Sequence, residues 1–273
     1  MTSILLIAGM VVLILIGAPI ALAMIVLPTV YILATGEAPL LTIPHQMYEA
    51  VASFPLVAIP FFMLTGELMN SSTVTERIID LSRQLVGRLR GGLAQVNIVA
   101  SMFFAGMNGS AVADTATIGS ILIPAMKRAG YAPAFAAGIT AVGSTIGGII
   151  PPSIGMIVLA SAANLSVGAL FAGGILPGIA IGLLLMLTTY VIAVRRQYER
   201  GKDRFRVLAV LRALLRAGFA LIVPIVLVGG ILGGWFSSIE SGAITACVTQ
   251  LIGAVAYRSI SFAEVAGAIG RTL

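Results

Sequence analysis

Long apolar stretches, separated by short polar connections, recur along the whole chain of 273 residues. A helix needs about 20 mostly apolar residues to cross the hydrocarbon of a bilayer. The pattern predicts spans at 4–33, 51–69, 167–194, 217–233 and 239–257, and two interrupted apolar segments at 91–126 and 132–163. It is typical of an all-α integral membrane protein, which we treat as one transmembrane domain over residues 1–273.

The connections between these segments have their own patterns. We expect Gly17-Ala18-Pro19 to bend the first span, because proline removes a backbone hydrogen bond. Residues 35–50 are predicted as a polar connection, and 195–216 as a basic cytoplasmic loop. Residues 73–90, which open on a capping box from Thr73 to Glu76, are predicted as an amphipathic helix along the membrane surface. Its apolar face consists of Ile78, Leu81, Leu85 and Leu89.

The two interrupted segments cannot be single straight helices. A helix over residues 91–126 would be about 54 Å long, which exceeds the bilayer thickness. We place its break at Gly106–Ser110 and predict a helical hairpin. The segment 132–163 contains glycines and the pair Pro151-Pro152 between residues 143 and 153, so it is predicted as a broken helix.

Composition and charge agree with a membrane protein. Hydrophobic residues make up 59% of the chain and charged residues 10%, whereas a soluble domain carries about 25% charged residues. The net charge of +6 comes from residues between apolar segments, which argues against nucleic-acid binding. All basic connections fall on the cytoplasmic side if the N-terminus is cytoplasmic and the segment 91–126 folds back.

The two breaks are the candidate functional sites. Irregular backbone at membrane depth is tolerated where it is buried in protein or lines a wet cavity. The breaks supply oxygen ligands, which suit a hard cation such as Na⁺, and half-helix N-termini, which suit anionic groups. Small residues that only allow close helix packing are the competing interpretation. The candidate substrate-binding residues are Asn108, Ser110, Ser144, Thr145, Pro151, Pro152 and Ser153; those for a partial Na⁺ site are Gly106, Asn108, Ser110, Gly147 and Gly148.

Three acidic residues lie in apolar surroundings, where a charge is a functional candidate. Glu67 is expected near the cytoplasmic end of its span, and Glu240 is expected to cap the last span with Ser237 and Ser238. Asp114 follows the first break, where it could cap the second half-helix or contact a substrate or proton. The single histidine and single cysteine make a transition-metal site improbable. The sequence contains neither a nucleotide-binding loop nor an obvious catalytic constellation, so we expect no enzyme activity.

Several motifs in this order and spacing resemble the large membrane subunit, DctM type, of tripartite ATP-independent periplasmic (TRAP) transporters. The resemblance covers essentially the whole chain. It rests on Ile59-Pro60-Phe61-Phe62-Met63-Leu64-Thr65-Gly66, Gly91-Gly92-Leu93, Asn108-Gly109-Ser110-Ala111-Val112-Ala113-Asp114, Gly130-Tyr131, Ile150-Pro151-Pro152-Ser153 and Leu176-Pro177-Gly178.

The resemblance implies a bacterial inner-membrane permease of the elevator type, driven by a Na⁺ gradient. A periplasmic binding protein would deliver an organic anion, such as a C4-dicarboxylate, another carboxylic acid or a sialic acid, and a small membrane subunit would brace the large one. The implied fold has two inverted repeats, each with a re-entrant hairpin and a broken helix. Residues 106–110 and 143–153 match the first repeat, with Asn108 where the family often has serine.

The main departure from the family is length, because the second repeat would begin only at about Ser261. A gene fragment, an incomplete chain and a split subunit are all open. A related carboxylate or ion symporter that works without a binding protein is the nearest alternative function. An intramembrane enzyme would need a reactive constellation, and a purely structural subunit would not explain two polar breaks.

We predict that these 273 residues alone do not transport, because half of the expected substrate and Na⁺ site would be missing. The test is uptake into liposomes that contain only this chain. Uptake above that of protein-free liposomes would contradict the prediction.

Overall fold

The computed structural model of the chain describes residues 2–70, 74–201, 206–253 and 267–270. Within these ranges the regular structure is helical, and the only β-type pairing is a single bridge between Arg90 and Arg200. The prediction of an all-helical membrane fold is confirmed. In chain order the elements are α1 (Thr2–Leu15), α2 (Ile20–Thr35), α3 (Thr42–Val51), η1 (Phe54–Val57), α4 (Ala58–Asn70), α5 (Val74–Val86), α6 (Gly92–Asn108), α7 (Ala111–Arg128), α8 (Pro133–Ser144), η2 (Thr145–Gly148), α9 (Ile154–Ala163), α10 (Val167–Arg195), α11 (Val207–Leu232) and α12 (Ser238–Leu251), where η marks a 3-10 turn.

The chain divides into two compact units, residues 1–53 and 54–273. In the first unit, the range 4–33 is two helices and not the one bent span that we predicted. The chain reverses at Gly17, which has a φ of +93°, and α1 and α2 pack together so closely that a Cβ on Gly9 would lie 3.1 Å from Leu27. The predicted connection 35–50 is also helical from Thr42 onward, in α3.

The second unit is organised around α6. Its main core packs the apolar face of α5 against α6, α7, α8 and α11. Ile78 and Leu81 of α5 are fully buried there, as the predicted apolar face requires. The helix α5 thus places this face on protein, and it ends at Val86, four residues before the predicted end.

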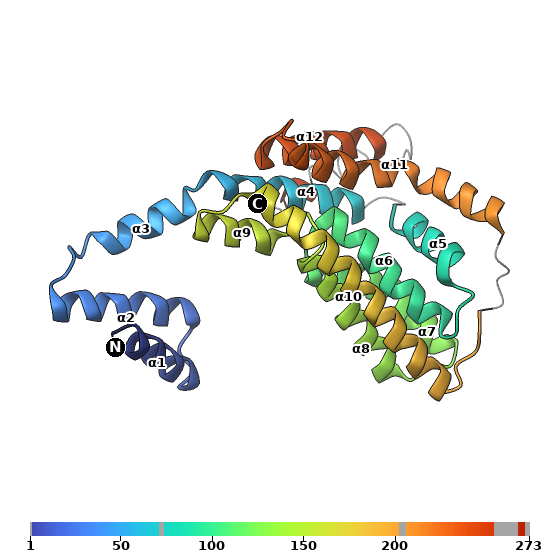
Figure 1. Cartoon of the computed structure of the whole chain (residues 1–273), viewed down its shortest axis with the longest axis horizontal. Coiled ribbons are helices and arrows are strands. Elements are labelled where there is room, and N and C mark those ends of the chain that lie inside the picture. Colours follow the sequence, from blue (N-terminus) through green and yellow to red (C-terminus); the bar gives the residue numbers. More distant parts are fainter. Residues whose placement is uncertain (1, 71–73, 202–205, 254–266, 271–273) are drawn as a thin grey trace. The chain divides into compact units, whose positions relative to one another are not determined.

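Figure 1 shows α6, α7, α8 and α10 running side by side, with α5 and α11 on the other side of α6. A second core joins α4, α9, α10 and α11 through Phe62, Ile157, Phe171 and Leu227. The helix α12 packs on α4 and α11.

Two helices, α10 and α11, are each long and apolar enough to cross a bilayer. Their outward side chains are large and apolar; on α10, for example, Leu183 is 58% and Leu187 60% exposed. Extended apolar surface of this kind requires a lipid or protein environment. The helix α11 begins at Val207 and not near residue 217, so the second half of the predicted loop 195–216 is helical. The span predicted at 239–257 is α12 as far as Leu251, and its end lies outside the described residues. Thr73 and Ser261 lie outside them as well.

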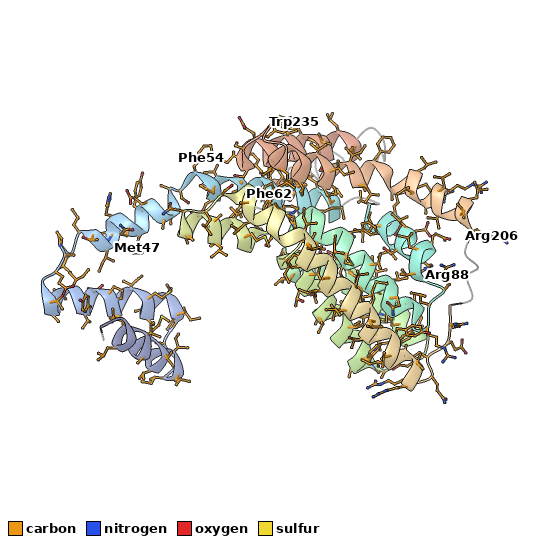
Figure 2. All side chains as sticks on the ribbon, in the orientation of Figure 1. Met47, Phe54, Phe62, Arg88, Arg206 and Trp235 are labelled. Atoms are coloured by element: carbon orange, nitrogen blue, oxygen red, sulfur yellow. The ribbon has the colours of Figure 1, made fainter. Side chains whose placement is uncertain are left out.

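The described parts of the basic connections after α5, α7 and α10 meet at one end of the second unit. A cavity of about 360 Å³ is lined by residues that follow α5, α7 and α10, among them Gly87, Ala129 and Arg200. Figure 2 shows Arg88 and Arg206 at this end, whereas Trp235 lies at the far end of α11. The segment 91–126 therefore enters and returns on the same side, as the distribution of basic residues predicts.

A row of glycines lets α10 approach the broken segment closely. Gly174, Gly178 and Gly182 are spaced four residues apart, so they lie on one face of the helix. A Cβ on Gly174 would lie 2.5 Å from the Ile149 carbonyl oxygen, and a Cβ on Gly178 would collide with the Ile150 side chain. Small residues at this spacing are typical of close helix contacts in membranes.

Substitution of Gly174 by alanine should lower the thermal unfolding midpoint of the protein in detergent by about 2–8 °C, because the new methyl group overlaps a backbone carbonyl. Gly173→Ala is the matched control, since a Cβ at Gly173 meets nothing within 4 Å. Alanine favours the helix over glycine by up to about 1 kcal/mol, so this control should be neutral or stabilising. Equal midpoints for the two variants would show that α10 does not make this contact.

Candidate functional site

The hairpin reverses through two residues. The helix α6 ends at Asn108, Gly109 adopts the left-handed conformation with a φ of +61°, and Ser110 is extended with a φ of −125°. Glycine tolerates this conformation because it has no Cβ. The Ser110 hydroxyl oxygen accepts a hydrogen bond from the Ala113 amide at 3.3 Å, which caps the N-terminus of α7. Of the predicted break at 106–110, only residues 109 and 110 are therefore non-helical.

The second break extends over residues 145–153. After α8 the chain makes the 3-10 turn η2, then an irregular stretch with a cis peptide bond between Pro151 and Pro152. Ser153 ends this stretch: its hydroxyl group donates to the Gly148 carbonyl oxygen at 2.8 Å, and its oxygen accepts from the Met156 amide at 3.3 Å. Ser153 is therefore the N-cap of α9, as Ser110 is of α7.

The two breaks are in direct contact. A Cβ on Gly109 would overlap the carbonyl oxygen of Pro152, and the Ile154 amide donates to the Gly109 carbonyl oxygen at 3.4 Å. The helices α7 and α9 therefore begin next to each other. Because each helix N-terminus carries a partial positive charge, this place favours an anionic group.

A buried carboxylate lies beside the same contact. Asp114 is fully buried on the first turn of α7. A Cβ on Gly147 would lie 3.0 Å from Asp114 Oδ2 and 3.4 Å from the Ala111 amide nitrogen, so η2 covers the start of α7. A buried negative charge is costly unless a cation, a proton or hydrogen bonds compensate it.

The prolines and glycines predicted for the site are largely brought together. Gly106 lies against Pro224 of α11, with its Cβ position 3.3 Å from that side chain and 3.8 Å from the Pro151 carbonyl oxygen. Pro152 and Ser153 form the contact with the hairpin tip, as described above. The contribution of Pro224 could not have been found from the sequence, in which it is only one proline inside an apolar span.

Other predicted residues lie away from this contact or are already engaged. Thr145 is exposed, and its hydroxyl donates to the Val142 carbonyl at 2.7 Å. The Gly148 carbonyl accepts from Ser153, and Ser144 is fully buried on the last turn of α8. The Asn108 side chain lies outside the described residues.

The acidic residues divide into structural and candidate functional groups. Glu240 caps α12, as predicted, and does so in a capping box with Ser237, in which the Ser237 amide donates to the Glu240 carboxylate at 2.8 Å. Glu67 is half-buried on α4. The N-cap of α7 is Ser110, and Asp114 lies on the first turn of the same helix, so capping by Asp114 through backbone amides stays a prediction. A role for Asp114 toward a substrate or a proton is equally a prediction.

Comparisons with known proteins place this geometry in a family. The family model described as "Tripartite ATP-independent periplasmic transporter, DctM component" matches residues 7–273. The sialic acid TRAP transporter large permease protein SiaM of Vibrio cholerae is 35% identical over 250 residues, which cover 90% of this chain and 57% of that protein. The 2,3-diketo-L-gulonate TRAP transporter large permease protein YiaN of Escherichia coli is 37% identical, over 91% of this chain and 58% of its own length.

A third relative, the C4-dicarboxylate TRAP transporter large permease protein DctM of Pseudomonas aeruginosa, is 38% identical over 80% of this chain and 51% of its own length. The chain therefore spans about half the length of the curated relatives that it matches. Since the family model extends over nearly all of the residues, the chain belongs to the DctM family of TRAP transporter large permease proteins.

Proposed function

We propose that this chain is part of the permease of a Na⁺-coupled TRAP uptake system for organic anions in a bacterial inner membrane. The observation that carries the proposal is the contact between Gly109 and Pro152, which joins two half-helix N-termini. Such paired termini are a recurrent way to bind anionic substrate groups in secondary transporters.

The names of the relatives support the substrate class. They refer to sialic acid, 2,3-diketo-L-gulonate, C4-dicarboxylates and isethionate. Each of these compounds carries a carboxylate or sulfonate group that is ionised at neutral pH. We therefore propose an organic anion, with a C4-dicarboxylate or a similar carboxylate as the first candidate.

The local chemistry also supports Na⁺ as the coupling ion. The contact between the breaks gathers neutral oxygen atoms, among them the carbonyls of Gly109 and Pro152, and the Asp114 carboxylate lies beside it. Oxygen ligands of this kind suit hard cations. In this proposal Gly106, Ser110 and Gly147 belong to the surroundings of one Na⁺ ion, and Asp114 contributes negative charge.

Two partners complete the proposed system. A periplasmic binding protein would deliver the anion, and a small membrane subunit would pack against the apolar outer surface of the permease. A symporter that takes the anion directly, without a binding protein, is the alternative. The two are told apart by whether uptake requires the periplasmic protein.

The test is uptake into proteoliposomes that contain the complete permease to which this chain belongs, its small subunit and the loaded binding protein. An inward Na⁺ gradient should drive accumulation of a radiolabelled C4-dicarboxylate or sialic acid, and an equal K⁺ gradient should not. Gly109→Ala should lower the initial rate by about tenfold or more. The left-handed backbone at residue 109 alone costs alanine about 1–2 kcal/mol, and about 1.4 kcal/mol corresponds to a tenfold change in an equilibrium constant. The methyl group of alanine would also overlap Pro152.

Gly138→Ala on α8 is the control, because a Cβ there meets nothing within 4 Å. It should transport like the unmodified protein. Equal uptake with Na⁺ and K⁺ gradients would contradict Na⁺ coupling, and full activity of Gly109→Ala would show that the contact between the breaks is not required.

A further inference from the structure

A second group of buried polar side chains lies between the helices α6 and α8. Asn97 and Ser101 are one turn apart on α6, and Thr140 lies on α8; all three are fully buried. None of them belongs to the contact between the two breaks. Polar groups at such depth normally have hydrogen-bond partners or bind something polar.

The hydrogen bonds in this group fix the orientation of the Asn97 amide. Its Nδ2 donates to Thr140 Oγ1 at 2.8 Å. The Thr140 hydroxyl in turn donates to the Ala136 carbonyl at 2.8 Å, so its oxygen can accept from Asn97. Because the amide nitrogen faces Thr140, the amide oxygen of Asn97 faces elsewhere.

The Asn97 oxygen faces Gly143, together with the hydroxyl of Ser101. A Cβ on Gly143 would lie 3.5 Å from Asn97 Oδ1 and 3.5 Å from Ser101 Oγ. Both oxygen atoms are fully buried, and neither has a hydrogen-bond partner among the described residues. The same is true of the hydroxyl oxygen of Ser144, the next residue on α8.

The place favours a cation over an anion. Asn97 Oδ1 can only accept, because the amide nitrogen of Asn97 already donates to Thr140, and the hydroxyls of Ser101 and Ser144 add oxygen lone pairs but no charged donor. Gly143 and Ser144 form the last turn of α8, where the helix dipole presents its negative end. In transporters with broken helices, the C-terminal ends of half-helices are typical positions for coupling ions.

We propose that Asn97, Ser101 and the α8 backbone at Gly143 bind a monovalent alkali cation, with Na⁺ as the expected ion. Asn97 Oδ1 and Ser101 Oγ are ligands from α6. Ser144 Oγ, backbone carbonyls and water supply the remaining oxygens. This position differs from the contact between the breaks, because Gly147, one turn further along, faces Asp114 and Ala111.

The site also ties the hairpin to the broken helix at a second point. An ion shared by α6 and α8 would hold these helices together about two turns away from the hairpin tip. The proposal does not depend on the transport proposal, since it needs only the two helices and the ion.

Gly143 offers a substitution that tests the site with little strain. A methyl group there would be in ordinary van der Waals contact with both oxygens, so Gly143→Ala fills the site without a collision. Ser101→Ala removes one ligand by an independent route. Gly138→Ala is the matched control on the same helix, in open surroundings.

The experiment measures equilibrium ²²Na⁺ binding to the purified protein in lipid nanodiscs, with choline as the replacement cation. Gly143→Ala and Ser101→Ala should each lose one bound Na⁺ per chain, or bind that ion about tenfold or more weakly. Gly138→Ala should bind as the unmodified protein does. Gly109→Ala, which alters the other proposed position, should retain the ion at Asn97.

Na⁺-dependent thermal stabilisation gives a second readout in the same samples. The shift should shrink in Gly143→Ala and Ser101→Ala while midpoints in choline stay close to that of Gly138→Ala. If all variants bind the same amount of ²²Na⁺ with the same affinity, the buried oxygens bind a water molecule only, and the proposal is overturned.

Discussion

A helix that is interrupted at membrane depth leaves backbone amides and carbonyls that lipid cannot hydrogen-bond. In this protein two interruptions satisfy that demand by contact with each other. The Ile154 amide donates to the Gly109 carbonyl oxygen, and serines at 110 and 153 cap the two helices that start there. The contact requires a glycine at 109, because any side chain would overlap Pro152. The geometry of the candidate site follows from this pairing.

The surrounding helices keep the pairing in place. The helix α10 lies directly on the broken segment because Gly174 and Gly178 carry no side chain there. From the other side, Pro224 of α11 contacts Gly106 near the hairpin tip. The apolar face of α5 packs against α6 and α11 and completes the main core. The contact between the breaks, at Gly109 and residues 151–153, is thus buried in protein, which is the condition for irregular backbone in a membrane.

Much of this arrangement could be predicted from sequence, because glycine and proline act locally. The breaks near residues 106–110 and 143–153 follow from backbone chemistry and segment length, and the structure has them. The capping of α12 by Glu240 was predictable for the same reason.

Features that depend on tertiary contacts were not predictable. The glycine and proline near Gly17 allow either a bend in one helix or a full reversal of the chain. Packing between α1 and α2 selects the reversal. The start of α11 at Val207 was not predicted, because Arg212 and Arg216 lower the local hydropathy to a level that is typical of a loop. The meeting of Asn97 and Ser101 with Gly143 joins positions more than 40 residues apart, and a single sequence gives no register between those helices.

The most direct test of the account is the proximity of the two breaks in the membrane. With the single cysteine replaced (Cys247→Ser), paired cysteines at Ala111 and Gly147 should be joined by a short thiol-specific cross-linker, because a Cβ on Gly147 would lie 3.4 Å from the Ala111 nitrogen. The control pair, Ala111 with Gly138, should not react, since Gly138 precedes Gly147 by nine residues, which is about two and a half helical turns. Efficient cross-linking of the first pair alone is the predicted result. No cross-linking of either pair, or equal cross-linking of both, would contradict the joined breaks on which the candidate site depends.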